Sequence, residues 1–261
     1  MNKAQKIIKY LAVALAIYLI CEIFIILANI IGIVGSSLNT SSKKINIPSS
    51  SAYLLVDLNS SNLIIKEGDK FTYQTTNENI KVTEENSKLI IKEKNDLKLK
   101  SSEVIVTIPK DMTLNDTIIN VDIGKVTIES LTTESLGLNV GAGNVEINKL
   151  VVTKNCEIDG GAGNITINNA NLYSADIDLG IGKTIITGTI NGKSEIDTGI
   201  GNLELNLIGT LNDYELDISK GVGSITLNDK ELKDEQKIGT GNNEIGIDGG
   251  IGAIKIKMKE E

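Results

Sequence analysis

A glycine-punctuated repeat between residues 115 and 261 constrains the fold more than any other feature of this sequence. Four close copies read NVGAGNVEIN, DGGAGNITIN, DLGIGKTIIT and DTGIGNLELN, and looser copies begin at residues 120, 217 and 248. A nearly constant period over so many copies is typical of a solenoid. The second glycine of each copy serves as a marker, and the markers lie 19, 20, 19, 19, 22 and 29 residues apart: Gly124, Gly143, Gly163, Gly182, Gly201, Gly223 and Gly252.

The copies also share aliphatic positions, which alternate with polar ones. In the close copies an aliphatic residue stands five residues before the marker and four residues after it, as Ile177 and Ile186 do around Gly182. A period of two predicts strands with one face in a core and the other in solvent. Each repeat has room for two or three short strands, so that successive coils would stack about 4.8 Å apart. The sequence therefore predicts an all-β protein with a parallel, β-helix-like solenoid over residues 115–261.

The region before the repeat is predicted to be a strand-rich N-terminal part of the same domain, over residues 52–114. It contains short alternating runs, such as AYLLVDL at 52–58 and EVIVTIP at 103–109, bounded by turn-forming residues. These strands and the charged C-terminal tail are expected to protect the two ends of the solenoid against edge-to-edge pairing. Residues 35–51 have no apolar period and are predicted to be a polar linker.

The N-terminal segment is a candidate membrane anchor. Residues 10–34 are almost entirely apolar, and 25 helical residues extend over about 37 Å, which exceeds a hydrocarbon core of about 30 Å. Three lysines among the first nine residues place residues 1–9 in the cytoplasm by the positive-inside rule. We therefore expect a single-pass protein of the cell membrane with an extracytoplasmic C-terminal domain. A cleaved signal peptide is the alternative, although its apolar region would be unusually long.

One acidic residue, Glu22, lies near the middle of this segment. An ionised carboxylate costs about 2.5 kcal/mol or more there, so Glu22 is expected to be protonated or to meet a partner, and it is the candidate for coupling the helix to another membrane protein. The neighbouring Cys21 cannot reach Cys156, so no disulfide framework is expected. Cys156 falls in an inward column and is predicted to fill space in the core.

The composition excludes several kinds of chemistry. The chain has no His, no Trp and no Arg, so histidine bases, histidine metal ligands and a Ser-His-Asp triad are absent, and two cysteines cannot form a structural zinc site. Without Arg, and with 3% aromatic residues, nucleic-acid binding is not expected. Because residues 1–44 carry five lysines and one acid, the formal charge of -8 becomes -12 for the rest of the chain. That charge favours cations or polycationic partners.

The repeated G-x-G pairs do not predict a nucleotide site, because a strand follows every pair where a dinucleotide fingerprint requires a helix. The glycines are instead predicted to provide positive φ angles or close packing at the corners of the solenoid. The sequence from Gly160 to Ile167 partly matches a calcium-binding nonapeptide motif, but Ile165 occupies the position where that motif requires Asp.

Two acidic columns, on the outward face of the strand before each glycine pair, are the candidate functional feature. Like charges about 4.8 Å apart repel by roughly 1 kcal/mol even in water. One interpretation is that the second column caps N–H groups at the corners while lysines and salt screen the rest. The alternative is a face for divalent cations or polycations, since hard cations prefer carboxylate oxygens; no other cofactor is expected. The first column is Glu157, Asp176, Glu195 and Glu215, and the second is Asp159, Asp178, Asp197 and Asp217.

The order of these features resembles the bacterial putative adhesin family, a β-strand-repeat domain of unknown function in envelope proteins. The resemblance rests on the N-terminal span, the strand-rich stretch ending in VTIPKDM and the repeated G-x-G-N-[IV]-x-[IL] units, and it covers most of residues 50–257. It implies a right-handed parallel solenoid at the cell surface without a catalytic motif. For some relatives it implies a link to envelope-stress signalling.

Three functions are therefore considered. The first is a non-enzymatic, membrane-anchored adhesin or surface-binding module for an envelope protein or a glycopolymer. The second is an envelope-stress sensor or modulator that acts through a membrane partner at Glu22. The third is a polysaccharide-processing enzyme with clustered carboxylates. The regular repetition of the acids and the scarcity of aromatic rings speak against this third hypothesis, and the protein is predicted not to be an enzyme.

Overall fold

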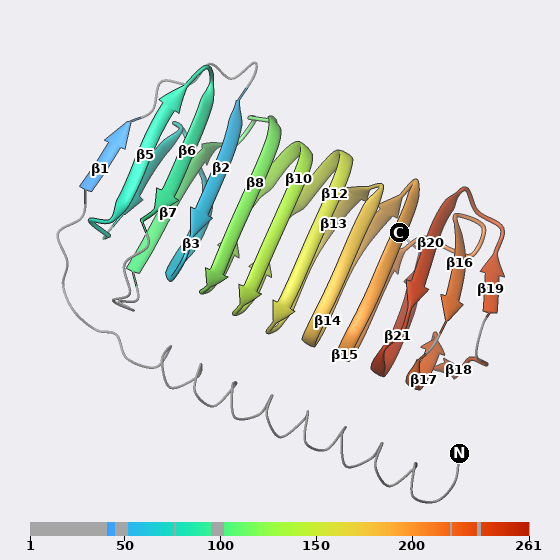
Figure 1. The fold of residues 1–261 in the computed structure, drawn as a ribbon. Coiled ribbons are helices and arrows are strands. Elements are labelled where there is room, and N and C mark those ends of the chain that lie inside the picture. Colours follow the sequence, from blue (N-terminus) through green and yellow to red (C-terminus); the bar gives the residue numbers. More distant parts are fainter. Residues whose placement is uncertain are drawn as a thin grey trace, which may run out of the picture. The chain divides into compact units, whose positions relative to one another are not determined.

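In a computed structural model, the described strands form one continuous sheet that winds into a solenoid (Figure 1). The structure describes residues 41–44, 52–75, 77–94, 102–219, 221–233 and 236–260. The all-β solenoid predicted from the repeat is confirmed for this part of the chain. The predicted membrane span at 10–34, with Glu22 and Cys21, lies outside the described residues. Within the described ranges, no helix is long and apolar enough to cross a membrane.

The middle of the solenoid consists of coils that follow one another in the sequence, each paired in parallel with the coil before it and the coil after it. In the earlier coils a long strand is followed, after the glycine corner, by a shorter one. In the last two coils the strand runs through the corner without a break. The strands are β8 (Leu114–Ile123), β9 (Val126–Ile128), β10 (Leu131–Ala142), β11 (Val145–Ile147), β12 (Leu150–Ala162), β13 (Ile165–Tyr173), β14 (Ala175–Asn191) and β15 (Lys193–Ile208).

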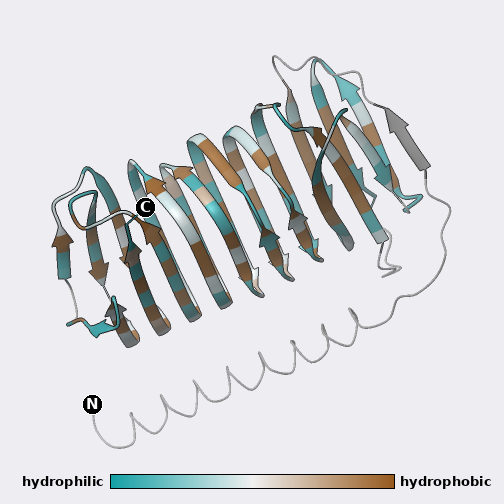
Figure 2. Ribbon diagram, turned by 180° about the vertical axis from the view of Figure 1, so that it is seen from behind, coloured by the Kyte–Doolittle hydropathy of each residue, from teal (hydrophilic) through white to brown (hydrophobic). Residues whose placement is uncertain are grey.

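The register of these strands stacks like residues on like residues. Ile158 lies beside Ile177 and Ile177 beside Ile196, and all three side chains are buried. The aliphatic columns predicted from the repeat are thus confirmed as the core, and polar residues alternate with them on the outer face (Figure 2). One coil could not bury these aliphatic side chains alone, so each coil depends on its neighbours. The result is one continuous hydrophobic core along the solenoid.

The N-terminal coils do not stack in sequence order. The coil formed by β2 and β3 lies between the β8–β9 coil and a later coil formed by β6 and β7, and it pairs in parallel with both. The outer coil is reached through two cap strands, β4 and β5. The strands of this end are β1 (Ser41–Lys44), β2 (Tyr53–Leu58), β3 (Ser61–Gly68), β4 (Thr72–Thr75), β5 (Ile80–Glu85), β6 (Lys88–Glu93) and β7 (Ser102–Pro109).

The C-terminal end repeats this arrangement with the chain order reversed. After β15 the chain first forms the outermost coil, β16 and β17, and then two cap strands. It finally returns to insert β20 and β21 between β15 and the outermost coil (Figure 1). The strands here are β16 (Tyr214–Ser219), β17 (Val222–Leu227), β18 (Lys230–Glu231), β19 (Gln236–Gly239), β20 (Asn243–Asp248) and β21 (Ile251–Lys259).

Antiparallel strands close the parallel stack at both ends. At the N-terminal end β5 pairs with β6 and β4 pairs with β7, and at the C-terminal end β19 pairs with β16 and β18 with β17. Such short antiparallel strands end the parallel ladder, which would otherwise present an open edge to another chain. The expectation that each coil stacks on the next along the sequence is therefore wrong at the C-terminal end. At the N-terminal end, the strands expected to protect the solenoid also form two of its coils. The residues between β17 and β20 form the cap, which explains the irregular last spacing of 29 residues.

Candidate functional site

The acidic columns lie on the outward face of β12, β14, β15 and β20, but their membership differs from the prediction. The inserted strand β20 separates β16 from β15, so Glu215 and Asp217 do not continue the columns. Asp248 takes the place predicted for Asp217, because it lies directly beside Asp197. The acidic face is therefore a first row of Glu157, Asp176 and Glu195 and a second row of Asp159, Asp178, Asp197 and Asp248.

The two displaced acids have other surroundings. Glu215 lies beside Glu244 and forms an ion pair with Lys237, with 2.6 Å between Oε1 and Nζ. This ion pair raises the pKa of Lys237. Asp217 lies opposite Gly246, which has no charge to add to a row. Sequence reasoning missed Asp248 although its signal was present, since Asp248 opens a copy of the repeat; the order of the copies in space was the missing information.

Two acids of the second row, Asp159 and Asp197, have raised pKa values. The pKa of Asp197 is raised above its ordinary value of 3.8 by partial desolvation and then by the neighbouring carboxylates, above all Asp248. The pKa of Asp159 is raised in the same way, by desolvation and then by Asp178 and Asp176. A raised pKa means that the folded state favours the protonated acid, so the ionised row opposes folding.

Three of these acids could hold a cation. Carboxylate oxygens of Glu195, Asp197 and Asp248 can all lie within 4.8 Å of one another, and all three side chains are exposed. Oxygen ligands in this number suit a hard divalent ion that keeps part of its water shell. The same geometry would also suit an ammonium group.

The second acidic row borders an open groove of about 480 Å³. Asp159, Asp178 and Asp197 form one wall, and the floor is largely backbone because the first glycine of each pair lines it. The absent side chains have a packing reason, since a Cβ on Gly180 would collide with the carbonyl oxygen of Gly161 in the coil before. The groove therefore offers carboxylates beside exposed peptide groups.

The marker glycines form the corner next to this groove. Gly182 has a φ of +147°, and a Cβ there would overlap the carbonyl oxygen of Gly163. All the markers from Gly143 onward have a positive φ, between 147° and 159°. Gly124, in the first of these coils, does not; a Cβ there would lie 2.8 Å from the carbonyl oxygen of Ser61. At each corner the glycine lets neighbouring backbones approach closely.

Cys156 lies away from this surface. It is buried between Leu136 and Ala175 in an inward column, as predicted, and burial raises the pKa of its thiol to about 12. A thiol that stays protonated is a poor nucleophile, so Cys156 contributes packing and no chemistry.

A capped stack of parallel coils, with rows of similar side chains on its outer faces, defines a repeat-built β domain. Residues 36–245 match the model of the Toastrack DUF4097 family, and the chain belongs to this family. The comparison with curated proteins gives no match.

The fold is shared with a solved structure. A putative adhesin from Bacteroides fragilis is 18% identical, with a TM-score of 0.55, and the match covers 85% of this chain and 98% of that one. A putative cell adhesion protein from Clostridium sporogenes is 15% identical, with a TM-score of 0.41, over 85% of this chain and 100% of that one. At these identities the first likeness shows the architecture alone.

Proposed function

We propose that the protein is a non-enzymatic surface-binding module of the adhesin type, held at the cell membrane with its solenoid outside the cytoplasm. The observation that carries this proposal is the acidic face, where seven carboxylates stand in two rows beside an open groove. Membership of the family, and the fold shared with a putative adhesin, support a role in surface binding.

The partner that best suits this face is polycationic. Each carboxylate lies beside at least one carboxylate of a neighbouring coil, and after desolvation these neighbours contribute to the raised pKa values of Asp159 and Asp197. A partner that brings positive charges to several coils at once relieves the repulsion between the carboxylates. The loss of this repulsion, which is present in the unbound domain, contributes to the binding free energy. Divalent cations at Glu195, Asp197 and Asp248 would compete for the same oxygens.

A charge-matched pair of variants tests this role. The full chain in detergent is applied to a polylysine surface, and Asp178→Asn/Asp197→Asn is compared with Glu84→Gln/Glu85→Gln, which removes as much charge from exposed positions on β5. We expect the first variant to lose most of the retention and the second to keep it, and millimolar calcium to reduce the retention of the unchanged chain. Equal losses in both variants would show that only net charge matters, and would contradict a role for the rows.

The arrangement of the acids also supports the non-enzymatic part of the proposal. Hydrolysis of a glycoside needs two carboxylates in different environments, one protonated and one ionised. Here the acids repeat at equivalent positions in successive coils. No hydrolysis of polysaccharides by the purified chain is expected, and release of reducing ends would contradict this.

Anchoring through residues 10–34 is part of the same proposal and rests on their apolar sequence. Addition of protease to intact cells checks it. We expect the domain after residue 34 to be digested while a tag before residue 1 is protected. Protection of both parts would rule out the proposed orientation.

A further inference from the structure

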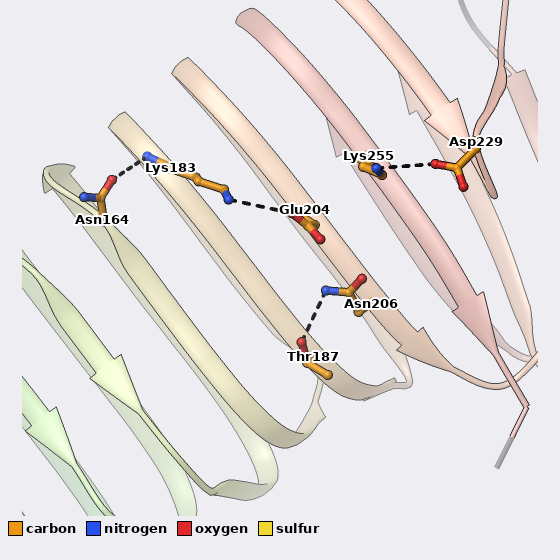
Figure 3. A network of polar contacts seen from close by, with 7 residues as sticks. All are labelled: Asn164, Lys183, Thr187, Glu204, Asn206, Asp229 and Lys255. Carbon is orange, nitrogen blue, oxygen red and sulfur yellow. Dashed lines mark hydrogen bonds and ion pairs between the residues drawn. The ribbon is translucent and has the colours of Figure 1, made fainter.

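The second exposed face of the solenoid, which follows the glycine corner on β11, β13, β14 and β15, has a different chemistry. An asparagine ladder runs along its edge, formed by Asn144, Asn164 and Asn202 and interrupted by Lys183, which lies between the last two. In each case the side-chain Oδ1 accepts a hydrogen bond from the backbone N–H of the next coil, at 3.1 to 3.2 Å. Figure 3 shows this bond between Asn164 and Lys183.

The bonds to Oδ1 fix the orientation of these carboxamides. Each amide group then directs its Nδ2 away from the neighbouring backbone, and no described residue accepts a hydrogen bond from Nδ2 of Asn144 or Asn164. Both side chains are exposed. The face therefore offers fixed donors in adjacent coils, which costs a ligand less ordering than flexible side chains would.

The charges on this face are paired. Lys125 Nζ lies 2.8 Å from Glu146 Oε2, and Lys183 Nζ lies 3.7 Å from Glu204 Oε2 (Figure 3 shows the second pair). Exposed pairs of this kind contribute little to stability. They do, however, leave the surface without a net charge, in contrast to the acidic face. A strongly charged ligand would therefore gain no net electrostatic attraction from this face.

A hollow of about 310 Å³ lies beside the two asparagines. Its other polar lining is Glu146, Thr166 and Lys183, and Ile185 adds a half-buried aliphatic surface. Donors, acceptors and an apolar patch thus alternate over a few ångströms. The hydroxyl groups and C–H faces of a sugar ring have the same mixture. Thr166 can both donate and accept, while Glu146 accepts.

Two other polymers fit this face less well. An added peptide strand would need unpaired backbone groups, but β13 pairs with β11 on one side and with β14 on the other. A nucleic acid would need unpaired positive charge and stacking aromatic rings, and the hollow has neither. An extended glycan repeats a neutral unit with an advance close to the spacing of about 4.8 Å between coils. Successive sugars of such a ligand can then lie over successive coils.

We propose that this second face binds a neutral, β-linked glycan laid across β11, β13 and β14, with its hydroxyl groups accepting from Asn144 and Asn164. This goes beyond the polycation role of the acidic face and does not depend on it. Without an aromatic platform each sugar contributes weakly, so retention at a surface depends on several contacts at once.

The test uses an isosteric change in the ladder. Asn164→Asp keeps an oxygen that accepts from the N–H of Lys183 but removes both Nδ2 donors. Asn202→Asp makes the same change in the same ladder outside the hollow and is the matched control. The full chain in detergent is passed over immobilised β-1,4-linked pentasaccharides of glucose and of N-acetylglucosamine, with a galacturonate pentasaccharide as the charged comparison. Melting temperatures verify that both variants are folded.

We expect retention on a neutral pentasaccharide and little on the galacturonate one. We also expect about a fivefold loss for Asn164→Asp, as for one or two lost hydrogen bonds, and no loss for Asn202→Asp. No retention of the unchanged chain on either neutral sugar overturns the proposal, as does an equal loss in the two variants. Asp178→Asn/Asp197→Asn should bind the sugars normally, so failure of the acidic-face role and failure of this proposal remain distinguishable.

Discussion

One outward-facing column of the solenoid carries asparagine in some coils and aspartate in others. In the column that contains Asp159, Asp178 and Asp197, the two coils before Asp159 carry asparagines, at Asn120 and Asn139. Both residue types fit the position, so the backbone does not require a carboxylate. The aspartates instead introduce repulsion that the asparagines avoid.

The first prediction concerns Asp197. Asp197→Asn should raise the melting temperature at pH 7 by about 1 to 2 °C, roughly 0.5 kcal/mol for a domain of this size, because the position is exposed. Since the folded state raises the pKa of Asp197 above 3.8, its unfavourable contribution is present at neutral pH and disappears as the pH falls through the raised pKa towards 3.8. The difference between the two proteins should therefore shrink on acidification. Asp217→Asn, outside the rows, is the control in thermal melts at several pH values.

The second prediction concerns Cys156, in a chain that carries Cys21→Ser. A buried thiol with a pKa near 12 should not react with a maleimide in the native domain and should react within minutes in denaturant. Mass spectrometry after labelling gives the labelled fraction. Rapid labelling without denaturant would mean that the coil around Cys156 opens readily.

At the level of the structural elements, the glycine corner gives the third prediction. Gly182→Ala should cost about 3 kcal/mol or more, or prevent folding, because a Cβ would overlap the backbone of the coil before and the φ of +147° disfavours alanine. Gly137→Ala is the control, since no atom lies within 4 Å of a Cβ built there. It should be neutral or slightly stabilising. Urea denaturation followed by circular dichroism compares them, and equal costs would contradict the role of the corner.

The inserted C-terminal coil gives the fourth prediction. Ile247 in β20 and Ile218 in β16 are equally buried and lie side by side. Ile247→Ala should increase hydrogen exchange both in β20–β21 and in the outermost coil, because that coil loses its inner neighbour. Ile218→Ala should increase exchange mainly in β16–β19. Exchange measured by mass spectrometry distinguishes the two, and an effect of Ile247→Ala confined to its own strand would argue against stacking in this order.

The sequence predicted what each coil repeats but not the order in which the end coils stack. Columns such as Ile158, Ile177 and Ile196 follow from a period of two, which any solenoid must obey. The insertion of β20–β21 could not be predicted in this way, because β16 presents the same alternation and would pair with β15 equally well by pattern. Which of the two strands, β16 or β20, lies beside β15 depends on pairing between residues far apart in the sequence. Asp248 was not predicted as a member of the acidic row because this pairing could not be predicted.

The domain as a whole carries a large net negative charge. Residues 45–261 have a formal charge of -12, and seven carboxylates are concentrated on one face. The fifth prediction is that sodium chloride raised from about 0.01 M to 0.15 M increases the melting temperature by a few degrees, since the screening length falls from about 30 Å to 8 Å. Asp178→Asn/Asp197→Asn should respond less than Glu84→Gln/Glu85→Gln. Identical responses would locate the repulsion outside the acidic face.

The exchanged order of the coils at both ends has a consequence for how such a domain can change in size. Each end is a closed unit, in which an inner coil, two cap strands and an outer coil hold one another in place. A coil duplicated or lost within such a unit would disturb the insertion. Between β8 and β15, by contrast, every coil meets its neighbours through the same ladder. One further repeat of 19 or 20 residues there would lengthen both exposed faces by one row and leave the ends unchanged.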